Sequence, residues 1–252
     1  MNAILYAFNP VNIIRELFSV GRWGMCYIPA CAAIMVGLSL WSWGSAWWEI
    51  LSAVSGVICV VLVAERKLTN FFWGLINCSL YGLTSYYAGF YGDMTLNWVL
   101  YVPFQIAGLL AWYKHSNGND EVIAKRFDKQ DTFFVTIAVL VAWGIGTGIL
   151  IWVGGEHPYA DSANVVLSVA ATLLMWGRYR EQWACWILVN LSGILMWGLK
   201  AYYGDGAGDP ALLMWVAFLV NSIYGYWTWS KASRPYEIKI ACTAQDIHGG
   251  RY

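Results

Sequence analysis

The sequence predicts an all-α polytopic integral membrane protein with eight transmembrane helices. Of its 252 residues, 59% are hydrophobic and 12% are charged, and that charged fraction is about half the value of a soluble domain. Eight apolar stretches approach the length of about 20 residues that a helix needs to span a bilayer core. One Trp-Asn pair recurs in two of these stretches. The predicted spans are 24–41, 46–64, 70–90, 95–114, 131–153, 163–177, 183–203 and 211–230.

Charged or turn-forming residues separate the spans. Glu65-Arg66-Lys67 follows the second span, and Tyr91-Gly92-Asp93 is expected to form a turn after the third. The resulting arrangement is one extra span, three spans, one linker span and three spans. The expected divisions are an N-terminal segment with the extra span (1–45), a first three-helix repeat (46–115), a cytoplasmic loop with the linker span (116–160), a second three-helix repeat (161–230) and a loosely ordered cytoplasmic tail (231–252).

Lysine and arginine predict the orientation, because these residues concentrate in cytoplasmic loops. If the N-terminus lies inside, eight crossings place 14 of the 15 Lys and Arg residues on the cytoplasmic side, and only Lys200 lies near the outer side. An odd number of spans would remove this asymmetry. We therefore expect both termini in the cytoplasm.

Two segments of the chain repeat each other at an offset of roughly 113 to 117 positions. When Trp73 is aligned with Trp186, Asn77 meets Asn190. Each Trp-Asn pair is four residues apart, so that its members share one face of a helix. Further aligned segments are Tyr91-Gly92-Asp93 with Tyr203-Gly204-Asp205, and Trp98-x9-Gly108-x3-Trp112 with Trp215-x9-Gly225-x3-Trp229.

The linker span determines the relative direction of the two repeats. Each repeat contains three crossings, which alone would leave the second repeat inverted in the membrane. The linker span adds a fourth crossing, so the two repeats run parallel. In transporters with such repeats, the substrate site lies near the bilayer midplane between the halves. A duplication retained only for packing is the alternative, but matching amides at matching depths favour transport, because a buried amide needs a partner.

This pattern resembles the PnuC family of bacterial nicotinamide riboside transporters. The likeness covers about residues 46 to 230 and is carried by Trp73-Gly-Leu-Ile-Asn77, Trp186-Ile-Leu-Val-Asn190, the two Tyr-Gly-Asp segments and the two Trp-x9-Gly-x3-Trp stretches. The resemblance implies a fold like that of the SWEET sugar transporters, facilitated diffusion, trapping of the substrate by a cytoplasmic kinase, and a homotrimer in the bacterial inner membrane. Relatives in the family carry thiamine or riboflavin.

Eight residues within the spans are the candidate substrate ligands. At 1.5 Å per residue, Asn77 and Asn190 lie about 10 Å inside the membrane, and Gln105 and Asn221 lie near its midplane. A single amide can simply join two helices, but four amides are more than a bundle needs for packing. The set is Trp73, Asn77, Tyr81, Gln105, Trp186, Asn190, Asn221 and Tyr224.

Other residues have a structural interpretation. Tryptophans near the ends of spans are interpreted as an aromatic belt at the membrane–water interfaces. Asp93 and Asp205 are interpreted as capping or solvated turn residues rather than gates. The belt tryptophans are Trp98, Trp112, Trp215 and Trp229.

Composition and motifs exclude several classes of function. The formal net charge is zero, so no basic surface is expected for nucleic acid. The six cysteines form no C-x-x-C motif or Cys/His cluster, and we expect small buried side chains with neither metal nor cofactor. An enzyme would need a nucleophile, paired carboxylates or metal ligands in a membrane cavity, and the sequence offers none. A receptor would be expected to carry a sizeable soluble module.

The candidate residues suit the chemistry of nicotinamide riboside, which has a pyridinium charge, a carboxamide and ribose hydroxyls. Aromatic faces attract the cation, and amides both donate and accept hydrogen bonds. A strong buried carboxylate would hold the cation too firmly for release. No charged residue or histidine lies clearly in mid-span, which argues for uncoupled alternating access. A carrier of another vitamin or of a sugar is the alternative, since it would use the same side chains.

Overall fold

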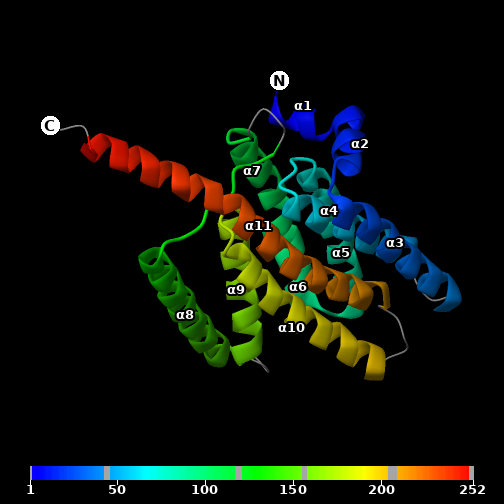
Figure 1. Cartoon of the computed structure of the whole chain (residues 1–252). Coiled ribbons are helices and arrows are strands. Elements are labelled where there is room, and N and C mark those ends of the chain that lie inside the picture. The colour runs from blue at the N-terminus through cyan, green and yellow to red at the C-terminus, as the bar shows by residue number, and fades with distance from the viewer. Residues whose placement is uncertain (1, 43–45, 117–120, 155–157, 204–208, 250–252) are drawn as a thin grey trace.

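Helices make up nearly all of the regular structure in the computed structural model (Figure 1). The structure describes residues 2–42, 46–116, 121–154, 158–203 and 209–249. These ranges contain no β-strand, only three isolated bridges, so the all-α prediction is confirmed. The elements are α1 (Ala3–Ala7), α2 (Pro10–Phe18), α3 (Arg22–Ser42), α4 (Trp47–Ala64), α5 (Asn70–Ala88), α6 (Tyr91–Thr95), the π-helix η1 (Leu96–Tyr101), α7 (Val102–Tyr113), α8 (Lys129–Trp152), α9 (Pro158–Trp176), α10 (Gln182–Tyr203) and α11 (Asp209–Gly249).

All eight predicted spans are helical, and seven of them begin and end within about five residues of their expected bounds; the eighth, 211–230, lies within the longer helix α11. In the described ranges, six helices are long and apolar enough to cross a membrane, or seven if α2 and α3, bent by 106° relative to each other, count as one span. The predicted span at 70–90 forms α5, which is not among them because its polar residues lower its hydropathy. The six are Trp47–Ala64, Tyr91–Tyr113, Lys129–Trp152, Pro158–Trp176, Gln182–Tyr203 and Pro210–Ser233.

Two short helices precede the first predicted span. The side chains of Asn2 and Asn9 accept hydrogen bonds from the first turns of α1 and α2, and Pro10 occupies the first position of α2. These are standard signals for a helix start. The carboxylate of Glu16 in α2 is buried and accepts hydrogen bonds from the N–H and the hydroxyl of Thr69, both at 2.8 Å. Thr69 is the N-cap of α5, so this contact ties the N-terminal segment to the start of α5.

The chain turns earlier after α5 than the sequence predicts. Gly89, with φ of 81°, ends α5 in the left-handed region, which glycine adopts without strain. Tyr91-Gly92-Asp93, expected as the turn, therefore begins α6 instead.

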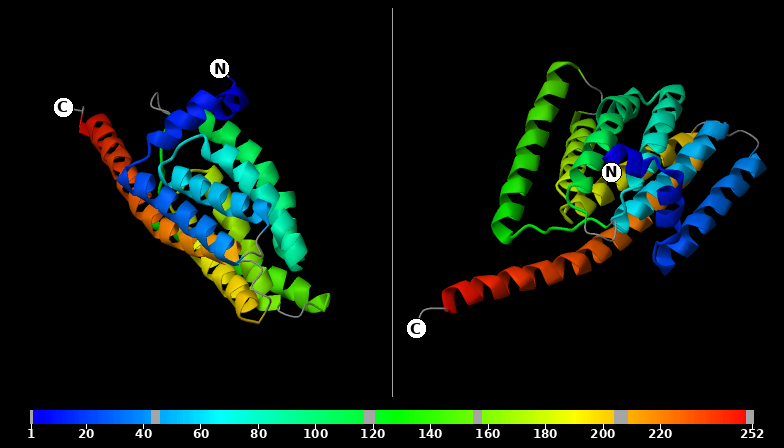
Figure 2. Two further views of the ribbon diagram at one scale, coloured as in Figure 1. Left: turned by 90° about the vertical axis from the view of Figure 1, so that its right-hand side faces the viewer. Right: turned by 90° about the horizontal axis from the view of Figure 1, so that it is seen from above.

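The C-terminal segment is helical beyond the last predicted span. Helix α11 continues past Lys231 to Gly249, and Figure 2 shows this part extending away from the bundle. No glycine, the usual residue after a helix end, occurs between Lys231 and His248, although the stretch contains Pro235.

The helices α4 and α9 end in the same way. Arg66 and Arg178 both have positive φ, 60° and 66°. In each case the N–H of the following residue reaches back to a carbonyl five residues earlier, Lys67 to Leu62 at 2.8 Å and Tyr179 to Leu174 at 2.9 Å. This is the hydrogen bond of a Schellman cap.

The helices pack into one bundle with α8 at its side (Figures 1 and 2). Helix α4 packs against α5 and α11, α10 packs against α9 and α11, and α8 packs against α9. Helix α11 belongs to the second half of the chain and packs against α4 of the first half. The two halves of the chain therefore contact each other through these helices. The cavity described next lies between the two halves.

Candidate functional site

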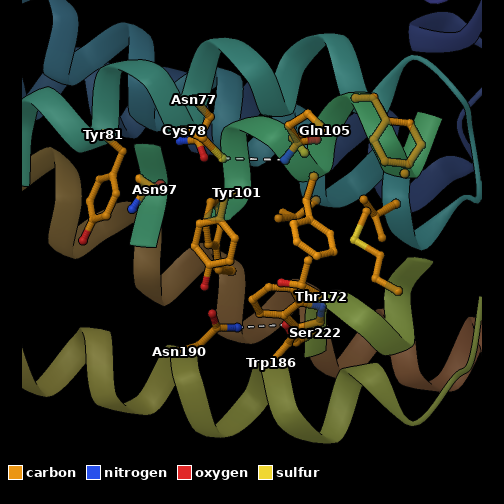
Figure 3. Close-up of a pocket in the computed structure, with 18 of the residues that line it drawn as sticks. Asn77, Cys78, Tyr81, Asn97, Tyr101, Gln105, Thr172, Trp186, Asn190 and Ser222 are labelled. Atoms are coloured by element: carbon orange, nitrogen blue, oxygen red, sulfur yellow. Dashed lines mark hydrogen bonds between the residues drawn. The ribbon is translucent and has the colours of Figure 1, made fainter. Parts of the chain in front are cut away.

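Helices from both halves of the chain enclose a cavity of about 130 Å³. One wall comes from α4, α5, η1 and α7, and the other comes from α9, α10 and α11. Of its 22 lining residues, all from the described ranges, nine are aromatic and none is Asp, Glu, Lys, Arg or His. Figure 3 shows Asn77 and Gln105 on one side and Asn190 and Trp186 on the other. The cavity therefore presents rings and neutral polar groups.

Asn77 is held in place by its amide nitrogen. This atom donates to the carbonyl of Ser52 at 2.9 Å and approaches the Ser52 hydroxyl at 3.3 Å and the sulfur of Met214 at 3.4 Å. A Cβ at Gly56 would lie 2.6 Å from the same nitrogen, so glycine makes room for it on α4. The amide oxygen of Asn77 accepts from no described residue.

Asn190 and Gln105 repeat this arrangement on other helices. The amide nitrogen of Asn190 donates to the hydroxyl of Ser222 at 2.8 Å, and that of Gln105 donates to the sulfur of Cys78 at 3.6 Å (Figure 3). The amide oxygen of Gln105 is buried without a partner. A Cβ at Gly74 would lie 2.5 Å from it, so the glycine allows the side chain to lie against α5.

These three amides share one feature. Their N–H groups are used within the protein, whereas their carbonyl oxygens accept from none of the described residues. An unsatisfied buried acceptor costs about 1 to 3 kcal/mol. The cavity is thus best suited to a ligand that donates hydrogen bonds from hydroxyl or amide N–H groups.

The π-helix adds two lining residues that the sequence analysis missed. Asn97 and Tyr101 both come from η1. Pro103, two residues after Tyr101, lacks a backbone N–H, so the carbonyl of Val99 cannot form the usual helical bond. A proline and a π-helical turn each bend a helix and change the direction in which nearby side chains point, and π-helical turns are frequent at functional sites. Pro103 is the sequence signal that was available.

One end of the cavity is closed by the Tyr81 closure, which we define as Tyr81, Asp93, Trp197 and Trp215. The Tyr81 hydroxyl donates to the Asp93 carboxylate at 2.9 Å and accepts from the indole N–H groups of Trp197 at 2.6 Å and Trp215 at 2.9 Å. Tyr81 and Asp93 belong to the first half, and the two tryptophans belong to the second. Within this cluster, a single hydroxyl therefore bonds to both halves.

Two of these residues correct the sequence analysis. Asp93 is buried, with 9% of its surface exposed, rather than a solvated turn residue, because Tyr91–Thr95 forms helix α6 and turns its side chain toward Tyr81. Trp215 lines the cavity rather than an interface with the membrane.

Next to the lining residues Val63 and Met175 lies the Trp112–Trp229 closure, which we define as these two tryptophans and in which each indole bonds to the opposite half. Trp112 donates to the carbonyl of Met175 at 2.8 Å, and Trp229 donates to the carbonyl of Val63 at 3.1 Å. The two rings lie 5.9 Å apart and are completely buried. Their assignment to an aromatic belt is wrong, because contact between the halves covers them.

The structure brings five of the eight predicted ligands to the cavity. These are Asn77, Tyr81, Gln105, Trp186 and Asn190.

The remaining three are not among the lining residues. Asn221 is fully buried and donates to the carbonyl of Val60 at 2.8 Å, which joins α11 to α4. The hydroxyl of Tyr224 donates to Glu65 at 2.7 Å, and its ring stacks on Trp23 at 4.9 Å. The indole nitrogen of Trp73 is buried without a partner, away from the cavity.

A helical protein with several candidate membrane spans and a neutral cavity between its two halves has the architecture of a small-molecule membrane transporter. A family model described as "Nicotinamide mononucleotide transporter" matches residues 46–231. The chain belongs to this family, which contains the PnuC transporters that the sequence resembles. Membership of a transporter family implies transport rather than catalysis.

Individual relatives support the same assignment. The chain is 39% identical to the nicotinamide riboside transporter PnuC of Neisseria mucosa over 191 residues, which cover 74% of this chain and 73% of that protein. It is 32% identical to the protein of the same name from Haemophilus influenzae, over 79% of this chain and 87% of the other. A solved crystal structure of the vitamin B3 transporter PnuC has a TM-score of 0.80 and 35% sequence identity, and covers 88% of this chain and 97% of its own.

Proposed function

We propose that this chain carries nicotinamide riboside across the bacterial inner membrane by uncoupled facilitated diffusion, with the substrate held in the cavity between the two halves. The observation that carries this proposal is the set of amides of Asn77, Gln105 and Asn190 among aromatic rings, whose nitrogens bond within the protein and whose oxygens are left for a ligand; the Gln105 oxygen is buried without a partner. The ribose hydroxyls and the carboxamide N–H groups are the donors that these oxygens need. The aromatic faces of Trp186 and Tyr101 suit the pyridinium cation.

The two compounds named for the family and for its relatives differ by one phosphate group. The family description refers to the mononucleotide, whereas the relatives are named for the riboside. A phosphate carries about two negative charges and offers only acceptors, and proteins usually bind it with Arg, Lys or backbone N–H groups. The described lining has no Arg or Lys and is rich in acceptors, which favours the riboside.

The absence of charged lining residues in the described cavity also supports uncoupled transport. Proton- and ion-coupled carriers usually hold ionisable groups along the substrate path. Alternating access would proceed by opening the Tyr81 closure and the Trp112–Trp229 closure in turn, so that each half rocks against the other.

The repeat arrangement is part of the proposal. We infer eight crossings, with α5 as a span that the polar cavity makes less hydropathic, and parallel repeats at 46–115 and 161–230 joined through 116–160. Two observations support the duplication. The ends of α4 and α9 have the same cap, and the aligned residues Trp112 and Trp229 make reciprocal bonds to the aligned ends of α9 and α4.

Orientation and assembly complete the proposal. We infer that both termini are cytoplasmic, since most Lys and Arg residues then lie inside, and the bridges from the 121–125 loop to Lys67 and Tyr179 gather basic residues at one end. Likeness to the PnuC family supports a homotrimer, which native mass spectrometry in detergent would measure.

Uptake of labelled nicotinamide riboside into liposomes that contain the purified protein tests the function directly. We expect uptake that stops at equal concentrations on both sides and does not change when a proton or sodium gradient is imposed. Unlabelled riboside should compete, whereas the mononucleotide, thiamine, riboflavin and simple sugars should not. Accumulation driven by a gradient contradicts the uncoupled mechanism, and competition by another compound but not by the riboside contradicts the substrate.

A further inference from the structure

A buried carboxylate lies directly behind the cavity wall. Asp93 is one hydrogen bond away from the lining, because the hydroxyl of the lining residue Tyr81 donates to its Oδ2 atom at 2.9 Å. The lining residue Asn97 approaches from the other side and donates to the backbone carbonyl of Asp93 at 2.9 Å. The carboxylate itself does not line the cavity.

This carboxylate has no cationic partner among the described residues. The ion pairs there are Arg66 and Lys67 with Glu121, and Arg180 with Glu181. Lys200 bonds elsewhere: its ammonium donates to the carbonyl of Ala88 at 3.2 Å and lies 5.5 Å from the ring of Phe90. A buried charge is costly unless it is compensated, and Asp93 is compensated by the Tyr81 hydroxyl and by its position in the first turn of α6.

The hydrogen bonds of Tyr81 determine how the charge of Asp93 can affect a ligand in the cavity. Its hydroxyl proton points to Asp93, and its oxygen accepts from Trp197 and Trp215. The hydroxyl is thus fully used and cannot bond a ligand, while its ring stays in the cavity wall. In a medium of low dielectric constant, the negative charge behind this ring is weakly screened and lowers the energy of a cation in the cavity.

We propose that Asp93, set behind Tyr81, is the specificity-determining charge that makes the cavity prefer a cationic pyridine nucleoside to a neutral nucleoside of the same shape. This inference rests on the proposed function and adds that the substrate is selected for its positive charge. Asp93 is a positioning residue, because it acts through Tyr81 and the field of its charge. Its distance behind the wall also explains how a carboxylate is compatible with substrate release, since no direct ion pair forms.

The test compares two ligands that differ in charge. Nicotinamide riboside has a pyridinium ring, and its reduced 1,4-dihydropyridine form has the same ribose and carboxamide without the charge. Calorimetry on the full-length protein in detergent gives Kd for both ligands. We expect Asp93→Asn, which keeps the shape and an acceptor for Tyr81, to raise Kd for the cationic form about tenfold and to change Kd for the neutral form less than about twofold.

Two further variants control for structure. Asp93→Glu keeps the charge and should retain the preference for the cation. Glu49→Gln removes another carboxylate from the first half, at the start of α4, where it caps the N–H of Ala46 and does not touch the cavity. That variant should bind both ligands as the wild type does.

The outcomes separate this inference from the proposed function. If Asp93→Asn weakens both ligands equally, or neither, the role of Asp93 is wrong while riboside binding stands. If the Asn variant does not fold, the two Kd values of the wild-type protein still test the inference, because equal affinity for the cationic and neutral forms overturns it. Failure of the wild type to bind either ligand overturns the proposed function and this inference with it.

Discussion

The Tyr81 closure and the Trp112–Trp229 closure join the two halves by different chemistry. At the Tyr81 closure, three partners from both halves bond to one side-chain oxygen. At the Trp112–Trp229 closure, two separate indoles each bond to a backbone carbonyl of the opposite half. The first depends on a single atom, whereas the second is divided between two separate bonds. A carrier with this asymmetry should be far more sensitive to substitution at one closure than at the other.

The largest expected effect is that of Tyr81→Phe. The substitution keeps the ring but leaves two buried indole N–H groups and the Asp93 carboxylate without their partner, and each such group costs about 1 to 3 kcal/mol. For three such groups we expect a loss of about 3 to 9 kcal/mol in the free energy of unfolding. Thermal unfolding in detergent would register this as a clearly lower Tm. A Tm equal to that of the wild type would mean that the hydroxyl does not hold the halves together.

Trp112→Phe and Trp229→Phe should each have a smaller effect. Each removes one indole hydrogen bond and leaves a small void, together worth about 2 to 3 kcal/mol, while the carbonyls of Met175 and Val63 keep the backbone bonds from Arg178 and Arg66. Because the remaining tryptophan still joins the halves, the single variants should retain uptake in liposomes. The double variant should lose more stability than the two single losses combined, since the rings are in contact. Simple additivity would show that the two bonds do not form one closure.

The smallest effect is expected outside the cavity. Tyr224→Phe removes one hydrogen bond to Glu65 and should cost no more than about 1 kcal/mol of stability. Its Kd for nicotinamide riboside should stay within about twofold of the wild-type value. If calorimetry shows weakening as large as that of the cavity variants, the substrate does not sit in the cavity described above.

The helices and their order could be predicted because hydropathy depends only on local sequence. Stretches of apolar residues between charged breaks locate a helix to within a few residues, as the agreement between 46–64 and α4 shows. Whether each helix crosses the membrane is harder to predict, since a span that lines a polar cavity, such as α5, loses hydropathy for functional reasons.

Counting residues along a helix predicts the height of a side chain but not the direction in which it points. Asn221, one of the predicted ligands, is next to the lining residue Ser222 in α11. The cavity face of that helix carries Met214, Phe218 and Ser222, spaced four residues apart, and Asn221 is turned by about 100° from Ser222. It therefore faces α4. The spacing of those three residues was present in the sequence, but nothing local marks them as the inner face.

Contacts between the two halves were not predictable from local pattern. Trp112 and Trp229 resemble interfacial anchors because they end apolar helices, and Asp93 resembles a turn residue because glycine precedes it. All three are buried only because the second half of the chain, or helix α6, covers them. Tertiary packing rather than propensity decides such positions.

The most direct test of the account is calorimetric titration of nicotinamide riboside into Asn77→Ala and Asn190→Ala, with Asn221→Ala as the matched control. All three variants remove a buried amide, but only the first two remove one that lines the cavity. We expect Kd to rise at least about tenfold for Asn77→Ala and for Asn190→Ala, because the ligand loses a buried hydrogen bond, and to change less than about twofold for Asn221→Ala. Wild-type affinity in both cavity variants, or equal weakening in all three, would contradict a substrate site between the halves.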